Sequence, residues 1–159
     1  MEEQKTGCLV CGAPLEYLQS QIEMECTYCH KKFMSNARCV NGHFICDSCH
    51  EQMGLRVIED ICRHTDSRDP VAIMKKIILS PYIYMHGPEH HVLVGSVLLA
   101  AYKNAGGELD LDAALEEMRN RGTQVPGGIC GLWGTCGAAV STGIFISLIT
   151  GASPLSGKE

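Results

Sequence analysis

The pattern of hydrophobic and polar positions changes about a third of the way along the chain. Before that point, apolar residues fall in short runs, of which residues 15–18 and 21–25 are typical of β-strands. After it, apolar residues recur at helical spacing, and Leu55 and Ile58 lie on one stripe that predicts a helix over residues 51–64. The sequence therefore predicts an α+β protein, in which a small module precedes an all-α helical domain.

Start and stop signals divide the rest of the chain into four further helices. Asp69 is an N-cap residue followed by Pro70, which suits the first turn of a helix, and Asp110 caps another. The last helix is rich in small residues that let helix backbones approach closely, so we expect it to be the central and most buried one. The expected helices cover residues 70–79, 88–105, 111–121 and 136–149.

The polar stretch 65–69 is the predicted linker between the two parts of the chain. The expected domains are a two-site module over residues 1–50, a connecting helix and linker over 51–69, and a helical domain over 70–159. The chain has 159 residues, of which 45% are hydrophobic, so it can form a hydrophobic core and global disorder is not expected.

Charge argues against one common role of cysteine-rich modules. Residues 1–69 hold seven Lys/Arg against eleven Asp/Glu, and the whole chain has a formal net charge of −5. A surface that binds duplex nucleic acid needs a basic footprint, and the sequence offers none. Nucleic acid is therefore not an expected partner.

The distribution of cysteines bears on the compartment. Eight of the ten fall in the first 62 residues, and the start of the chain lacks the pattern of a signal peptide. The most apolar stretch, residues 136–150, is too short and too rich in hydroxyl side chains to span a bilayer. We expect a cytoplasmic protein without a membrane partner, in which clustered cysteines are metal ligands or redox groups rather than disulfides.

Eight residues of the N-terminal module have the spacing of zinc ligands. Two Cys-x-x-Cys pairs lie fourteen residues apart, and each presents two thiolates from a tight turn. A third group follows, in which an Asn-Gly turn separates a cysteine from a histidine and a further Cys-x-x-Cys pair. Together they supply two closed sites for two zinc ions: Cys8, Cys11, Cys26, Cys29, Cys39, His43, Cys46 and Cys49.

The pairing of these ligands is open to two interpretations. A sequential pairing gives a zinc ribbon followed by a compact second site. A cross-braced pairing joins the first Cys-x-x-Cys pair to Cys39 and His43, and the second pair to Cys46 and Cys49. We favour the cross-braced pairing, because a hairpin followed by a helix with two ligands at its start is how treble-clef sites are built.

Two other interpretations of the module are weaker. The Cys-x-x-Cys-His patterns at residues 26–30 and 46–50 match haem attachment sites, but covalent haem requires export and leaves four ligands without a role. The spacing over residues 39–49 resembles the core of RING-type modules. A final Cys-x-x-Cys pair is missing here, although Cys62 and His64 could substitute for it.

The helical domain carries a second cluster of chemically active residues. Three histidines and a carboxylate surround the start of a helix, and two cysteines flank a glycine-rich stretch further on. We expect the two halves to meet in one pocket that suits a transition metal, an iron–sulfur cluster or thiol redox chemistry. The alternative is helix capping and ordinary burial. The candidate catalytic residues are His86, Glu89, His90, His91, Cys130 and Cys136.

The chain resembles an uncharacterised prokaryotic family of unknown function that is common in anaerobes and methanogens. The resemblance rests on the cysteine-rich start, on His-Gly-Pro-Glu-His-His at residues 86–91 and on Cys-Gly-Leu-Trp-Gly-Thr-Cys-Gly at residues 130–137. It implies no activity. Residues 136–138, Cys-Gly-Ala, are also similar to the Gly-Cys-Ala motif of a redox-active bacterial family, with the first two residues reversed.

Two functions from different classes remain open, and whether the protein is an enzyme stays undecided. In the first, the zinc module is structural and the helical domain carries out redox or metal-dependent chemistry on a small-molecule substrate. In the second, the protein is a non-catalytic adaptor that docks on a larger enzyme. A nucleic-acid-binding zinc protein is disfavoured by the acidic module.

Overall fold

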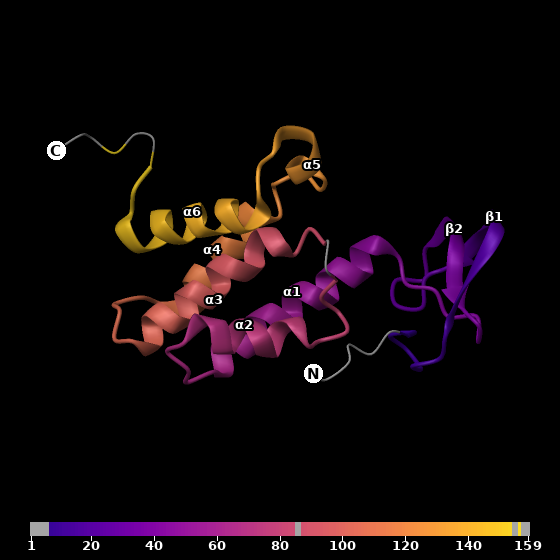
Figure 1. Ribbon diagram of the computed structural model, residues 1–159, viewed down its shortest axis with the longest axis horizontal. Coiled ribbons are helices and arrows are strands. Elements are labelled where there is room, and N and C mark those ends of the chain that lie inside the picture. The colour runs from indigo at the N-terminus through magenta and orange to yellow at the C-terminus, as the bar shows by residue number, and fades with distance from the viewer. Residues whose placement is uncertain (1–6, 85–86, 154–155, 157–159) are drawn as a thin grey trace.

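The computed structural model describes residues 7–84, 87–153 and 156. In this part of the chain it contains one two-stranded antiparallel sheet and six helices, so the expected α+β class is confirmed. Figure 1 shows the sheet at one end of the molecule and the helices stacked at the other. The strands are β1 (Leu15–Glu25) and β2 (Lys32–Cys39).

The two strands form a hairpin whose ends carry the cysteines. Leu15 pairs with Cys39 at one end, and Glu25 pairs with Lys32 at the other. The two short runs expected over residues 15–18 and 21–25 belong to one strand, and its register shifts between Tyr17 and Ile22. The hairpin therefore brings residues near 8–14 beside residues 39–43, while its turn presents residues 26–29 at the far end.

The helices follow the expected order, with one addition. The N-caps are confirmed: the Asp69 carboxylate accepts a hydrogen bond from the Val71 N–H, and the Asp110 carboxylate accepts one from the Ala113 N–H. A short helix near residue 130 was not expected. The helices are α1 (Asp47–His64), α2 (Pro70–Ile78), α3 (His90–Asn104), α4 (Leu111–Gly122), α5 (Ile129–Trp133) and α6 (Gly137–Thr150).

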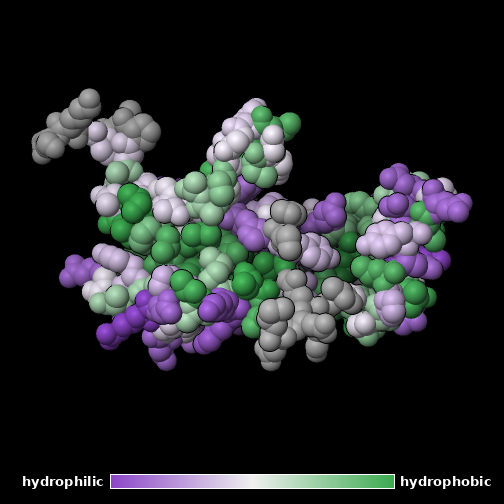
Figure 2. Space-filling view, in the orientation of Figure 1, coloured by the Kyte–Doolittle hydropathy of each residue, from purple (hydrophilic) through white to green (hydrophobic). Residues whose placement is uncertain are grey.

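The central helix is α3, and the prediction that residues 136–149 form the most buried helix is wrong. Nine residues of α3 are buried, whereas Ser141 is the buried residue of α6. The small residues of α6 do let it lie close to α3, but its other side faces outward. Figure 1 shows α6 lying over α3 and α4. Figure 2 shows apolar side chains gathered where α6 meets the helices beneath it. The burial of these helices depends on their position among the other helices and not on their mean hydropathy.

Helix α1 links the two parts of the molecule. It begins at Asp47, four residues before the expected start, and runs through the expected domain boundary after residue 50. One face of its second half, with Leu55, Ile58 and Cys62, is buried in the core with α2, α3 and α4. The division into domains stays a prediction. No helix in the described part of the chain combines the length and apolarity needed to cross a membrane.

Candidate metal centres and a buried polar cluster

The eight ligand-type residues of the N-terminal module come together in two groups of four. In each group, one nitrogen or sulfur atom from every residue lies within 4.8 Å of the others. The grouping is cross-braced, as favoured from the sequence, and each group could hold a metal ion. The first centre comprises Cys8, Cys11, Cys39 and His43, and the second centre comprises Cys26, Cys29, Cys46 and Cys49.

The distances within the groups suit tetrahedral coordination. The sulfur atoms of Cys11 and Cys39 lie 3.5 Å apart, and those of Cys29 and Cys46 lie 3.8 Å apart. An ion with metal–sulfur bonds of about 2.3 Å holds its sulfur ligands roughly 3.8 Å from one another. A disulfide requires only about 2.05 Å between the two sulfur atoms. All cysteines are free thiols, and the geometry fits an ion between them.

Backbone amides orient the sulfur atoms from outside each group. The Asn41 N–H donates to the sulfur of Cys39 over 3.3 Å, and the Cys46 N–H donates to that of Cys26 over 3.4 Å. The tight turns also need glycine, since Gly12 and Gly42 have φ values of 73° and 84°. Such N–H···S contacts are the outer support that metal–thiolate sites use to fix their ligands.

Crowding of the thiols creates an electrostatic conflict that a cation resolves. The backbone N–H of Ala13, together with the Asn41 side chain, lowers the pKa of Cys11 to about 6. In the second centre, burial and hydrogen bonds with Cys46 and Cys29 raise the pKa of Cys49 to about 12. In the second centre, the Cys49 thiol therefore stays protonated near neutral pH when no ion is bound, whereas a divalent ion stabilises every thiolate at once.

The module has almost no other core. Among residues 7–46 five side chains are buried, and Met24 is the one that is not a ligand-type cysteine. Several large apolar side chains of the hairpin are exposed, including Tyr17 at 74% and Met34 at 61%. A segment with so little buried apolar surface cannot offset the entropy of ordering its backbone. The donor set therefore fits a metal ion as the core of the module.

The interpretations that used other ligand sets do not match this grouping. The four sulfurs of the two Cys-x-x-Cys-His patterns converge on one point, which suits one ion rather than two haems. Cys62 lies in the helical core, where burial raises its pKa to about 12, and His64 bonds to the Asp60 carbonyl at the surface. These two residues therefore do not complete a RING-type site.

In the helical domain, the expected histidine cluster is part of a joint with the module. The Glu89 carboxylate accepts a hydrogen bond from the Tyr84 N–H over 3.2 Å, and His90 Nε2 lies 2.7 Å from the Tyr84 carbonyl oxygen. The Tyr84 ring stacks on His50 with a centroid distance of 3.8 Å and an interplanar angle of 4°. Glu89 and His90 thus hold Tyr84 against His50 of α1, and His50 directly follows the ligand-type Cys49.

Buried polar atoms without partners gather at this joint. Of the four such side-chain atoms among the described residues, three belong to the buried polar cluster, defined as His50, Glu89 and His91. All three side chains are more than nine-tenths buried. Burial lowers the pKa of both imidazoles, so each is held neutral. Unpaired buried polar atoms cost free energy, which makes this cluster a candidate site for water or a ligand.

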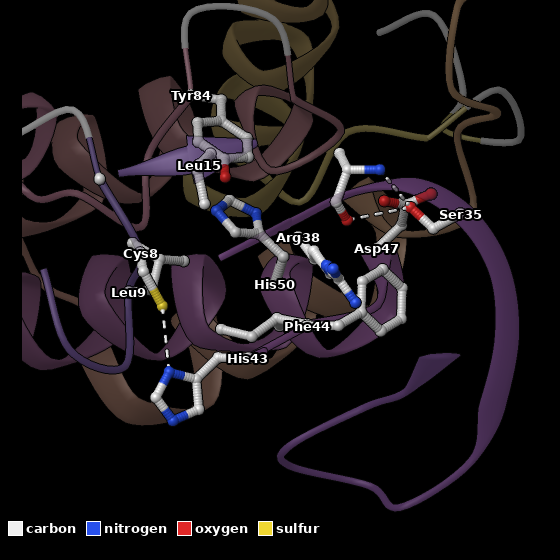
Figure 3. Close-up of a pocket in the computed structure, with 13 residues that line it drawn as sticks. Cys8, Leu9, Leu15, Ser35, Arg38, His43, Phe44, Asp47, His50 and Tyr84 are labelled. Atoms are coloured by element: carbon white, nitrogen blue, oxygen red, sulfur yellow. Dashed lines mark hydrogen bonds between the residues drawn. The ribbon is translucent and has the colours of Figure 1, made fainter. Parts of the chain in front are cut away.

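A cavity of about 190 Å³ lies between the joint and the first centre. Figure 3 shows the stacked rings of His50 and Tyr84 on one side of it and His43 with Cys8 on another. Asp47 and Arg38 contribute charged groups, and Arg38 is already paired with Glu16 over 2.6 Å. The cavity therefore lies between the N-terminal module and Tyr84, and residues of both parts of the chain line it.

The two halves of the expected helical-domain site meet in part. A Cβ on Gly137 would lie 2.8 Å from the His91 ring, so the start of α6 lies directly against the start of α3. Cys136 precedes this glycine and is exposed, and the first-turn amides of Ala139 and Ala138 lower its pKa. Cys130 lies on α5 and is also exposed. His86 lies outside the described residues.

No third group of metal ligands forms among the helical-domain residues that the structure describes. The further metal or iron–sulfur cluster expected there stays a prediction. Sequence reasoning missed His50 and Tyr84 as members of the joint. The signal available in the sequence was that His50 directly follows Cys49. The same Cys-x-x-Cys-His pattern also matches a haem attachment site.

The fold and the two centres define an α+β protein with two four-residue groups that could hold metal ions. Residues 58–159 match DUF5714, a family of unknown function, and the chain belongs to this family. The matched region contains both helical-domain motifs, whereas the eight ligand-type residues precede it. No curated protein and no solved structure matched the sequence.

Proposed function

We propose that the protein is a two-zinc protein whose ions are structural and hold a treble-clef-like module against a helical domain with a reactive thiol. Zinc suits closed tetrahedral sites with three or four thiolates and at most one imidazole. A closed site has no open position for a substrate, so the chemistry belongs to the helical domain. A reducing compartment such as the cytoplasm suits a chain whose cysteines are all free thiols.

The observation that carries this proposal is the composition of the module's interior. Four of its five buried side chains are cysteines of the two centres, and the fifth is Met24. Removing the ions would leave the hairpin with one buried apolar side chain. The free energy that folds residues 7–46 therefore comes from metal coordination, as in other small zinc modules.

Zinc content of matched variants tests the proposal. We expect two zinc ions per chain in protein purified without oxygen, measured by native mass spectrometry and elemental analysis. Cys46→Ser removes a buried ligand of the second centre and should lower the content to one. Cys130→Ser, at an exposed position outside both centres, is the matched control and should keep two. Two ions in Cys46→Ser, or none in the wild type, would refute the assignment.

The reactive group that we propose for the helical domain is the Cys136 thiol. It is exposed, its pKa is lowered by the first turn of α6, and the buried His91 packs against the next residue. A lowered pKa increases the fraction of thiolate, which is the nucleophile in thiol redox and group-transfer chemistry. Alkylation followed by peptide mass analysis should modify Cys136 several-fold faster than a cysteine in the denatured chain. Equal rates would remove this part of the proposal.

An adaptor role is the second candidate, and the exposure of α5 favours it. Leu132 and Trp133, both on α5, are 78% and 74% exposed. Aromatic side chains of this kind are enriched where proteins bind partners. Trp133→Ala should abolish association with a partner enzyme if the adaptor role holds, and should leave alkylation of Cys136 unchanged.

A further inference from the structure

We propose that the metal ion of the second centre regulates the thiol site, because it fixes the start of α3 through a chain of contacts from Cys49 to His50, Tyr84 and Glu89. This inference rests on the proposed function, since it needs zinc at that centre and a reactive Cys136. In this proposal, the first centre affects only the shape of the hairpin. The second centre also determines whether the buried polar cluster stays shielded from water.

The first step is that α1 depends on the second centre for its N-terminal turns. Cys46 is the N-cap residue, and it makes no side-chain capping hydrogen bond. Among residues 47–53, His50 is the one buried side chain, and Gln52 accepts a hydrogen bond from Arg119 of α4 over 2.6 Å, so few contacts hold these turns in place. Zinc with four thiolates carries a net charge of about −2 at this helix N-terminus, which stabilises the exposed amides of the first turn.

The second step is the contact between α1 and the loop before α3. His50 follows the ligand Cys49 and stacks face to face on Tyr84 at 3.8 Å. Figure 3 shows the two rings face to face at the edge of the cavity. None of the helices packs against the hairpin to the extent that the helices pack on one another. The stacked pair is therefore a main contact through which the state of the module reaches the helical domain.

The third step runs from Tyr84 to the start of α3. Both backbone polar groups of Tyr84 are held by side chains of the motif, its N–H by Glu89 and its carbonyl by His90. A Cβ at Gly87 would overlap the Glu89 carboxylate, so the Gly87 backbone lies directly against that side chain. If Tyr84 loses its stacking partner, its contacts with Glu89 and His90 loosen. The unpaired atoms of the buried polar cluster then gain water as a partner, which favours the open form.

The last step connects the cluster to the thiol. His91 lies against Gly137, the first residue of α6, and the amides that lower the pKa of Cys136 belong to the same turn. Loosening of His91 therefore disturbs the turn that stabilises the thiolate. Loss of the second ion should make Cys136 less reactive at neutral pH.

Hydrogen exchange in matched ligand variants tests the regulation. Cys29→Ser removes a ligand of the second centre, and Cys11→Ser removes one of the first. We expect amides of residues 90–92 to exchange about tenfold faster in Cys29→Ser, since their protection reports local opening. The same amides should stay within twofold of the wild type in Cys11→Ser. Alkylation of Cys136 should slow about threefold in Cys29→Ser alone.

Zinc content of the same samples separates the two ideas. If Cys29→Ser retains two ions, the proposed function fails. If it loses one ion while exchange at residues 90–92 is unchanged, the regulation fails and the zinc assignment stands. Unchanged alkylation together with faster exchange overturns the link to the thiol.

Variants of Tyr84 test the contact without touching a ligand. Tyr84→Ala removes the ring that stacks on His50 and leaves the backbone groups that Glu89 and His90 hold. It should keep two zinc ions and still reproduce the fast exchange of Cys29→Ser. Tyr84→Phe keeps the stacked ring and should match the wild type. If the amides of residues 90–92 exchange as slowly in Tyr84→Ala as in the wild type, the proposed chain of contacts is wrong.

Discussion

The close approach of α6 to α3 gives a prediction whose sign can be worked out from the structure. Gly95 lies in the middle of α3, where its backbone N–H donates to the Ser141 hydroxyl over 2.7 Å. A Cβ at this glycine would lie 2.6 Å from the Ser141 carbonyl oxygen and would also overlap the end of the Met118 side chain. The methionine can move aside, but the backbone of α6 cannot move without the whole helix.

Two effects compete in Gly95→Ala. Alanine in a helix interior is more stable than glycine by about 0.5–1 kcal/mol. Forcing a methyl group into a filled helix contact costs about 1–3 kcal/mol. Because the obstacle is backbone, we expect the second effect to dominate and Gly95→Ala to lower the free energy of unfolding by about 1–2 kcal/mol.

Gly143→Ala is the matched control for this experiment. Gly143 lies in α6, and a Cβ there would have no neighbour within 4 Å among the described atoms. This substitution should raise stability by up to about 1 kcal/mol. Urea denaturation of the zinc-loaded protein, followed by circular dichroism, measures both changes. If Gly95→Ala stabilises the protein as much as Gly143→Ala does, α6 does not contact α3 as described.

Three further predictions concern capping, a buried carboxylate and the thiol. Asp110→Ala removes the cap of α4 and should cost about 1 kcal/mol of stability in the same urea assay. Glu59 is 8% exposed and pairs with two arginine side chains, so Glu59→Ala should cost about 1–3 kcal/mol and Glu59→Gln less. The rate of alkylation of Cys136 should rise with pH at a lower midpoint than in the denatured chain, because its pKa is lowered in the fold. A midpoint equal to that of the denatured chain contradicts this last expectation.

The sequence predicted well those features that depend on local chemistry. The N-caps Asp69 and Asp110 were identified because a carboxylate before a helical stripe has one favourable role there. The cross-braced grouping followed from the expectation of a helix near Cys46, which places two ligands at its start. Ligand spacing and helix signals act over a few residues, so they can be read without the fold.

Features that depend on contacts between distant segments could not be predicted. The burial of α6 was overestimated, because an apolar helix of small residues can lie at the surface if one side packs closely. His50 and Tyr84 are 34 residues apart in the chain, and nothing in the local sequence indicates that their rings stack. The contacts of Glu89 and His90 with the backbone of Tyr84 were also not predicted, and the expectation that the histidine motif binds a ligand stays a prediction.

The central claim is that metal coordination takes the place of a hydrophobic core in residues 7–46. Hydrogen exchange of the zinc-loaded protein, before and after anaerobic treatment with a strong chelator, tests it most directly. We predict that amides of β1 and β2 are protected in the loaded protein and lose that protection in the chelated protein, while amides of α2 and α4 remain protected. Strands that stay protected after both ions are removed would contradict the claim.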